Sequence, residues 1–114
     1  MREETCSSYY INIWIAGDAN AIEQKLREYC MENGFCATVT PTKYIYTGGQ
    51  EDGVVVGIRN YPRFPDRPGN LAAKARWLAG DLMNAACQWS CMIETPEETT
   101  WLSSRPKSGE GENG

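Results

Sequence analysis

The residues best suited to chemistry follow a hydrophobic run, in the proline-rich segment 60–69. Arg63 and Phe64 are adjacent there, between Pro62 and Pro65, and Pro68 follows in the same segment. An arginine offers a planar fork of N–H donors that can hold a phosphate, and a neighbouring aromatic ring can stack on a base. Proline fixes φ, so this segment can hold both side chains in one pose. The pair therefore indicates a site for a small anion that carries a ring, unless Phe64 only plugs the edge of the core.

The segment 101–105 repeats these two side-chain types. Trp101 and Arg105 supply the ring and the guanidinium, and Ser103 lies between them. The structural alternative is that Trp101 packs on the sheet and Arg105 begins a solvated tail.

Other kinds of chemistry find little support. The chain has no histidine, which excludes Ser-His-Asp and Cys-His catalysis and histidine metal sites. The five cysteines are an odd number, and the spacing of Cys87 and Cys91 is not that of a zinc knuckle. They are expected to be reduced core residues. We expect no metal, no cofactor and no disulfide framework.

The acidic residues also give a weak signal for catalysis. Glu94, Glu97 and Glu98 gather near one turn, and Glu51 with Asp52 near another. Nothing in the sequence places two of these carboxylates in a shared pocket. The glycine-rich stretch 48–53 lacks the GK[ST] ending of a phosphate loop and is expected to be a hairpin turn. The protein is therefore not expected to be an enzyme.

The charge is unevenly distributed. The net charge is −4 and the isoelectric point is near 4.8, which argues against binding a long nucleic acid. Residues 59–76 nevertheless carry five basic residues and one acidic residue, enough for a local anion site. No apolar run approaches the length of a membrane span, and no membrane partner is expected.

The hydrophobic periodicity predicts an α+β domain over residues 1–105 and a disordered tail over 106–114. Asn20 and Glu23 have the spacing of a capping box, and Gly34 is placed to end the first helix. Pro41 separates two β segments, or bends one long strand. In order, the elements expected are a strand at 9–16, a helix ending at Gly34, strands at 35–40, 43–47 and 54–58, a helix at 71–86, and strands at 89–93 and 99–103.

This β-α-β-β-α-β order with an added strand favours a ferredoxin-like two-layer sandwich, an antiparallel sheet with two helices on one face. The other face would stay open and would carry aromatic residues such as Trp14, which indicates an interface. Trp77 lies outside the apolar stripe of its helix and is a further candidate contact. We expect a homodimer or a larger homo-oligomer.

Five strings of residues together resemble the anti-Thoeris sponge proteins of bacteriophages: residues 9–18, 27–30, 37–49, 60–65 and 101–105. The resemblance implies a binder in the host bacterial cytoplasm that sequesters cyclic ADP-ribose isomers, such as glycocyclic ADP-ribose, without cleaving them. The host TIR effector would then stay inactive. It also implies dimers that assemble further, and for some members a site for cyclic oligonucleotides.

The resemblance makes Arg63, Phe64, Trp101 and Arg105 the expected ligand contacts. In this interpretation Asn60, Thr99 and Ser103 would bind the ribose hydroxyls of the ligand. The alternative is a phage inhibitor that blocks a host protein through the aromatic face of the sheet.

Overall fold

The computed structural model describes residues 1–105, and the predicted disordered tail at 106–114 lies outside the described residues. The chain forms, in order, β1 (Tyr10–Ala16), α1 (Ala19–Asn33), β2 (Thr38–Tyr46), β3 (Gly49–Arg59), α2 (Pro68–Ala86), β4 (Ser90–Glu94) and β5 (Thr99–Ser103).

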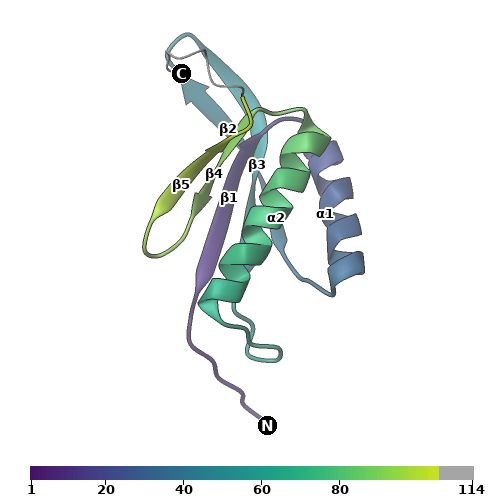
Figure 1. Ribbon diagram of the computed structural model, residues 1–114, viewed down its shortest axis with the longest axis vertical. Coiled ribbons are helices and arrows are strands. Elements are labelled where there is room, and N and C mark those ends of the chain that lie inside the picture. Colours follow the sequence, from purple (N-terminus) through teal and green to yellow (C-terminus); the bar gives the residue numbers. More distant parts are fainter. Residues whose placement is uncertain (106–114) are drawn as a thin grey trace.

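The strands form one antiparallel sheet in the order β2-β3-β1-β4-β5. Both helices pack on the same face of this sheet, in front of it in Figure 1. The predicted fold class, a two-layer α+β sandwich with two helices on one face, is confirmed.

The core lies between the sheet and the helices. Ile11, Ile13 and Ile15 alternate along β1 and are almost fully buried, as the period of two predicted. From α2, Leu71, Ala75, Leu78 and Leu82 pack against them, so the predicted apolar stripe is the buried one. These contacts remove apolar surface from water and provide the main driving force for folding.

The predicted end of α1 is confirmed, whereas the predicted cap at its start is wrong. Gly34 ends the helix with a left-handed φ of 57°, as predicted. The predicted capping box at the start is wrong: Asp18 is the N-cap, and its side chain accepts a hydrogen bond from the backbone N of Asn20 at 3.0 Å.

The hairpin between β2 and β3 is longer than predicted. Pro41 lies within one continuous strand at the edge of the sheet, where a missing N–H is tolerated. The glycine-rich stretch 48–53 is not a loop, because β3 begins at Gly49, which pairs with Tyr46. The connection is only Thr47 and Gly48, and Gly48 has a φ of 88°, which favours glycine.

Two further predictions shift by a few residues. α2 begins at Pro68 rather than Leu71, because proline suits the first turn of a helix, where its missing N–H is not needed. β4 begins at Ser90, so Trp89 precedes it and is half exposed, whereas Cys91 and Ile93 are buried as expected. Trp77 is 74% exposed, in agreement with its place outside the apolar stripe.

Candidate functional site

The face of the sheet away from the helices carries a row of large side chains. Trp14 of β1 pairs with Met92 of β4, and Met92 pairs with Trp101 of β5, so the three side chains lie on one face as neighbours. Trp101 is 63% exposed and Met92 is 39% exposed. The open aromatic face that the sequence indicated is therefore present.

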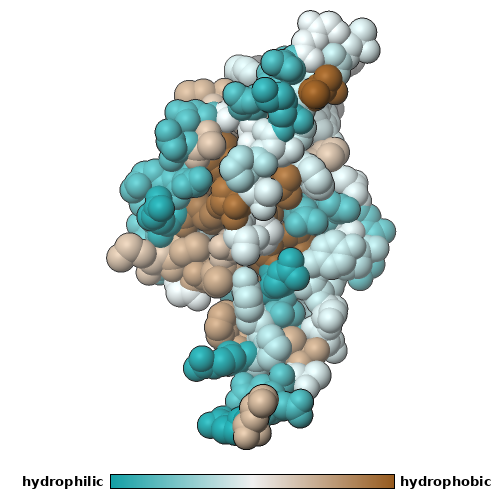
Figure 2. Space-filling model, turned by 180° about the vertical axis from the view of Figure 1, so that it is seen from behind, coloured by the Kyte–Doolittle hydropathy of each residue, from teal (hydrophilic) through white to brown (hydrophobic). Residues whose placement is uncertain are grey.

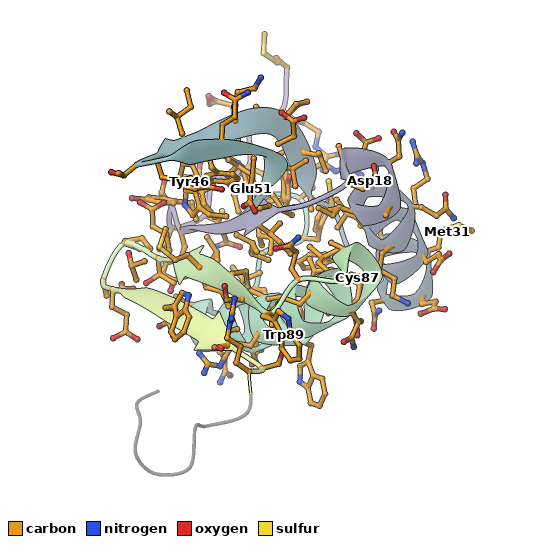
Figure 3. All side chains as sticks on the ribbon, turned by 90° about the horizontal axis from the view of Figure 1, so that it is seen from above. Asp18, Met31, Tyr46, Glu51, Cys87 and Trp89 are labelled. Atoms are coloured by element: carbon orange, nitrogen blue, oxygen red, sulfur yellow. The ribbon has the colours of Figure 1, made fainter. Side chains whose placement is uncertain are left out.

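This face is hollowed into what we call the sheet trough, with a volume of about 210 Å³. Because β2 and β5 are the two edge strands, a single hollow lined from both requires the sheet to curl. Figure 3 shows the β2–β3 hairpin, with Tyr46 and Glu51, on one side of β1 and the β4–β5 pair on the other. The trough is lined by Trp14, Ala16, Tyr44, Glu51, Gln88, Ser90, Cys91, Met92 and Trp101.

The Trp14 ring is held in the trough by a hydrogen bond. Its Nε1 donates to Oε1 of Glu94 at 2.9 Å, and Nδ2 of Asn12 donates to the same oxygen at 3.3 Å. Asn12 and Glu94 are directly paired across β1 and β4, so the register of the strands brings these groups together. Glu94 lies inside β4 and not in the turn that follows it.

Tyr44 forms a fixed wall of the trough. Its hydroxyl donates to the carbonyl oxygen of Val54 at 2.9 Å, and its ring lies against Gly53, where a Cβ would come within 2.6 Å of the Tyr44 Cε2. Burial raises the pKa of the Tyr44 hydroxyl above its usual value, which keeps it protonated and donating. Tyr44 therefore shapes the site and is not placed to give up a proton.

The electrostatics of the trough favour a positively charged ligand. Glu51 is the charged residue that lines it, no basic residue among the described residues 1–105 lines it, and Glu94 accepts a hydrogen bond from the edge of the Trp14 ring. A cation over an indole face is attracted by the ring, and a nearby carboxylate adds to this attraction.

The predicted residues of the C-terminal segment lie on or near this face. Thr99, Trp101 and Ser103 alternate along β5 and point to the same side of the sheet, but only Trp101 lines the trough. Thr99 lies opposite Glu94 at one end of the strand, and Ser103 opposite Ser90 at the other. Arg105 follows the strand, exposed, and its backbone N donates to the Ser103 hydroxyl at 3.2 Å.

The predicted residues of the proline-rich segment lie elsewhere. Arg63 and Phe64 are exposed in the connection from β3 to α2, at the bottom of Figure 1, whereas the chain leaves β5 near the top. The Phe64 ring stacks on Tyr61 with centroids 5.1 Å apart. One chain therefore does not bring Arg63 and Arg105 together.

Asn60 has a structural role in this connection. Its Nδ2 donates to the carbonyl oxygen of Ser7 at 2.9 Å, and its Oδ1 accepts from the backbone N of Asp66, also at 2.9 Å. Asp66 in turn accepts from Lys74 Nζ at 2.9 Å, which is the main reason that its pKa falls to about 2. The connection is therefore held in shape by the side-chain amide of Asn60 and by the ion pair of Asp66 with Lys74, as well as by its prolines.

Several trough residues were not predicted as ligand contacts. Trp14 was expected on the open face but only as part of an interface, and Glu51 was assigned to a turn. Gln88 and Ser90 carried no signal in the sequence. The signal that existed is the alternation of β1 and β4, which places Trp14 and Met92 opposite the buried face.

Other hollows are less suited to a specific ligand. A groove of about 460 Å³ between α1 and β2 is lined mainly by Leu26, Cys30, Met31, Ala37 and Val39. Seen from behind, the molecule shows hydrophobic residues in the middle of its surface (Figure 2). A groove of about 610 Å³ runs along α2 beside Trp77. Neither is walled by aromatic residues from more than one element.

Two further findings concern residues 1–105. Within this range no three His, Cys, Asp or Glu side chains come together as metal ligands. No helix in the same range has the length and hydrophobicity needed to cross a membrane.

Solved structures of phage enzymes share this fold. A phage SAM lyase in its apo state matches with a TM-score of 0.75 and 12% identity over 95% of this chain and 99% of that chain. A phage SAM lyase in complex with S-methyl-5'-thioadenosine matches with a TM-score of 0.71 and 14% identity over 91% and 95% of the two chains. At these identities the likeness concerns the fold. No family model matches the sequence, and no curated protein does.

This comparison corrects one expectation. From the sequence we expected a protein that is not an enzyme, and that expectation is overturned because the neighbours in fold are named as a lyase. The missing histidine excludes only the mechanisms that use one. The likeness supports a related fold and does not itself assign an activity to this chain.

Proposed function

We propose that this protein binds S-adenosylmethionine in the sheet trough and cleaves it. The observation that carries the proposal is the composition of the trough within residues 1–105: two indole rings with a carboxylate and no basic residue. S-adenosylmethionine has a flat adenine, a sulfonium cation and an ammonium group. Trp14 and Trp101 can take the ring and the sulfonium, and Glu51 the positive groups.

The fold neighbours support the same class of ligand. One of them holds S-methyl-5'-thioadenosine, which is the thioether left when S-adenosylmethionine loses its amino-acid side chain. The adenosine part is common to both molecules, and the positive charge distinguishes them. In our proposal the rings bind the common part, and Glu51 discriminates by charge.

The chemistry of such a cleavage makes few demands on the protein. A lyase adds no water, so the bond between sulfur and the γ-carbon can break as the ligand's own carboxylate oxygen bonds to that carbon. The electron pair stays on sulfur, which becomes a neutral thioether, and the amino-acid part closes into a lactone. No proton moves, so no histidine is needed. Because opposite charges disappear along the way, a site from which water is excluded favours the reaction over bulk water.

We further propose that a second copy of the chain covers the trough. Its volume of about 210 Å³ is below the roughly 300–1,000 Å³ of usual ligand pockets, and its rim is exposed at Trp101. A homo-oligomer formed across this face would exclude water from the ligand and bury the aromatic row. Light scattering of the purified protein tests this part directly.

The test of the proposed function is incubation of the full chain with S-adenosylmethionine, followed by chromatography. We expect S-methyl-5'-thioadenosine to accumulate with time. Glu51→Gln should lower kcat/KM about tenfold, because it removes a charge beside the ligand, and Glu32→Gln on the exposed side of α1 should change nothing. A wild-type protein that neither binds nor consumes S-adenosylmethionine refutes the proposal.

A second candidate is the sequestration of a cyclic ADP-ribose isomer in the cytoplasm of a phage-infected bacterium. The observation that favours it is a separate groove of about 540 Å³ lined by Arg2, Arg63, Glu4 and Pro62, with Phe64 exposed nearby. The guanidinium of Arg63 suits a phosphate, and that of Arg2, which pairs with Glu4 at 3.2 Å, could add a second contact on leaving that ion pair. Titration with cyclic ADP-ribose, in the wild type and in Arg63→Ala, tests this site: binding that Arg63→Ala leaves unchanged would exclude it.

A further inference from the structure

We propose that Glu94 is a positioning residue that sets the affinity of the sheet trough by orienting the Trp14 ring. This inference rests on the proposed function, because it concerns how the same trough holds its ligand. Glu94 does not line the trough and acts through Trp14.

The geometry fixes the ring from its polar edge. The indole N–H is the only polar group of tryptophan, and here it donates to a partly buried carboxylate at 2.9 Å. A hydrogen bond to an ionised group is stronger than one between neutral groups. Asn12 holds the same carboxylate oxygen from the neighbouring position on β1, so the acceptor is itself fixed.

The three exposed indole rings show the contrast. Trp77, Trp89 and Trp101 are 74%, 50% and 63% exposed, and none of their indole N–H groups has a hydrogen-bond partner within residues 1–105. A ring that is already held in its binding orientation loses less conformational entropy when a ligand stacks on it. Trp14 is therefore the preorganised surface of the trough, whereas Trp101 lacks such an anchor.

The charge of Glu94 has a second effect. A carboxylate at the edge of the indole makes the potential over the ring more negative, which favours a cation on its face. Glu94 should therefore contribute more to binding of S-adenosylmethionine than to binding of the neutral S-methyl-5'-thioadenosine. A purely structural residue would affect both ligands alike.

The experiment measures binding of S-methyl-5'-thioadenosine to the full chain by calorimetry, and the apparent affinity for S-adenosylmethionine from the KM of its cleavage. Glu94→Leu removes acceptor and charge, Glu94→Gln keeps an acceptor without the charge, and Trp14→Phe keeps a ring without the N–H. We expect Glu94→Leu to weaken binding of S-methyl-5'-thioadenosine about tenfold, and Glu94→Gln to weaken S-adenosylmethionine more than the thioether. In the Trp14→Phe background, Glu94→Leu should weaken the thioether no further.

A readout without ligand accompanies these titrations. The indole N–H resonance of Trp14, assigned from Trp14→Phe, should shift most in Glu94→Leu, which removes the acceptor, and less in Glu94→Gln, which keeps a weaker neutral acceptor. A wild type that binds the thioether, with Glu94→Leu binding it equally well, overturns this inference alone. A wild type that binds neither compound ends the proposed function, and this inference with it.

Discussion

Gly53 tests the shape of the trough more directly than any polar residue. A Cβ at this position would lie 2.6 Å from the Tyr44 Cε2, 2.7 Å from the Ala16 Cα, and in contact with the Ile15 carbonyl oxygen. Two of these three atoms belong to the backbone of the adjacent strand β1, which cannot move aside easily. Gly53 has no positive φ, so the effect of Gly53→Ala is steric alone.

The expected cost of Gly53→Ala is that of overpacking a buried site, about 1–3 kcal/mol. For a domain of this size the melting temperature should fall by roughly 5–15 °C. The Tyr44 ring, which lines the trough, must also shift. Ligand affinity should therefore fall even at temperatures where the Gly53→Ala variant is fully folded. Circular dichroism melts and calorimetric titration with S-methyl-5'-thioadenosine measure the two effects.

Two other glycines provide matched controls. At Gly57 the nearest atom to an added Cβ is the Thr38 Oγ1 at 2.5 Å, the end of a side chain that can rotate, so Gly57→Ala should cost less. At Gly80, inside α2, an added Cβ meets nothing within 4 Å, so Gly80→Ala should stabilise the helix by about 0.5–1 kcal/mol. A Gly53→Ala variant that melts with the wild type would refute the packing of Tyr44 and β1 described above.

Two further predictions concern single side chains. Trp101→Ala should weaken binding of S-methyl-5'-thioadenosine about tenfold or more in calorimetry, because it removes a stacking surface of the trough. Trp77 is also largely exposed but lies outside the trough, so Trp77→Ala should leave binding unchanged. Equal losses of affinity in the two variants would argue against the trough as the binding site. Asp66 has a folded pKa of about 2, below its usual 3.8, so it stabilises the fold above about pH 4 and this contribution is lost as the pH falls through 2. Melting curves should therefore show Asp66→Asn destabilised at pH 6 and converging with the wild type at pH 2, and a constant difference would contradict the ion pair with Lys74.

Much of the fold follows from local sequence patterns. The alternation in β1, the stripe of α2 and the stop at Gly34 each depend on residues close together in the chain, and each is confirmed. The hairpin is the instructive failure. Glycine and acidic residues in 48–53 have the composition of a loop, yet pairing with β2 keeps Gly49 to Gly53 in the strand. Tertiary pairing here overrides local propensity.

The site was harder to predict because it depends on register. Arg63 and Phe64 attracted attention because suitable side-chain types are adjacent in the sequence. The trough instead joins residues from all five strands, and only the pairing of Trp14 with Met92 and of Met92 with Trp101 shows that they are neighbours. Glu94 was assigned to a turn for the same reason, although its position opposite Asn12 is what gives it a role.

The distribution of charge along the sheet decides between the two classes of ligand. A diphosphate in the trough would place negative charge beside Glu51 and near Glu94. Two like charges about 4 Å apart repel by about 1 kcal/mol in water and about 4 kcal/mol near a protein surface. Arg63, which could offset this repulsion, follows the end of β3, whereas Glu51 of the trough lies near the start of the same strand. A sulfonium meets the opposite situation, since both carboxylates and the indole faces attract it. The charge of the trough therefore suits the proposed cationic adenosine derivative better than a cyclic diphosphate, for which the basic groove beside Arg63 is the better candidate.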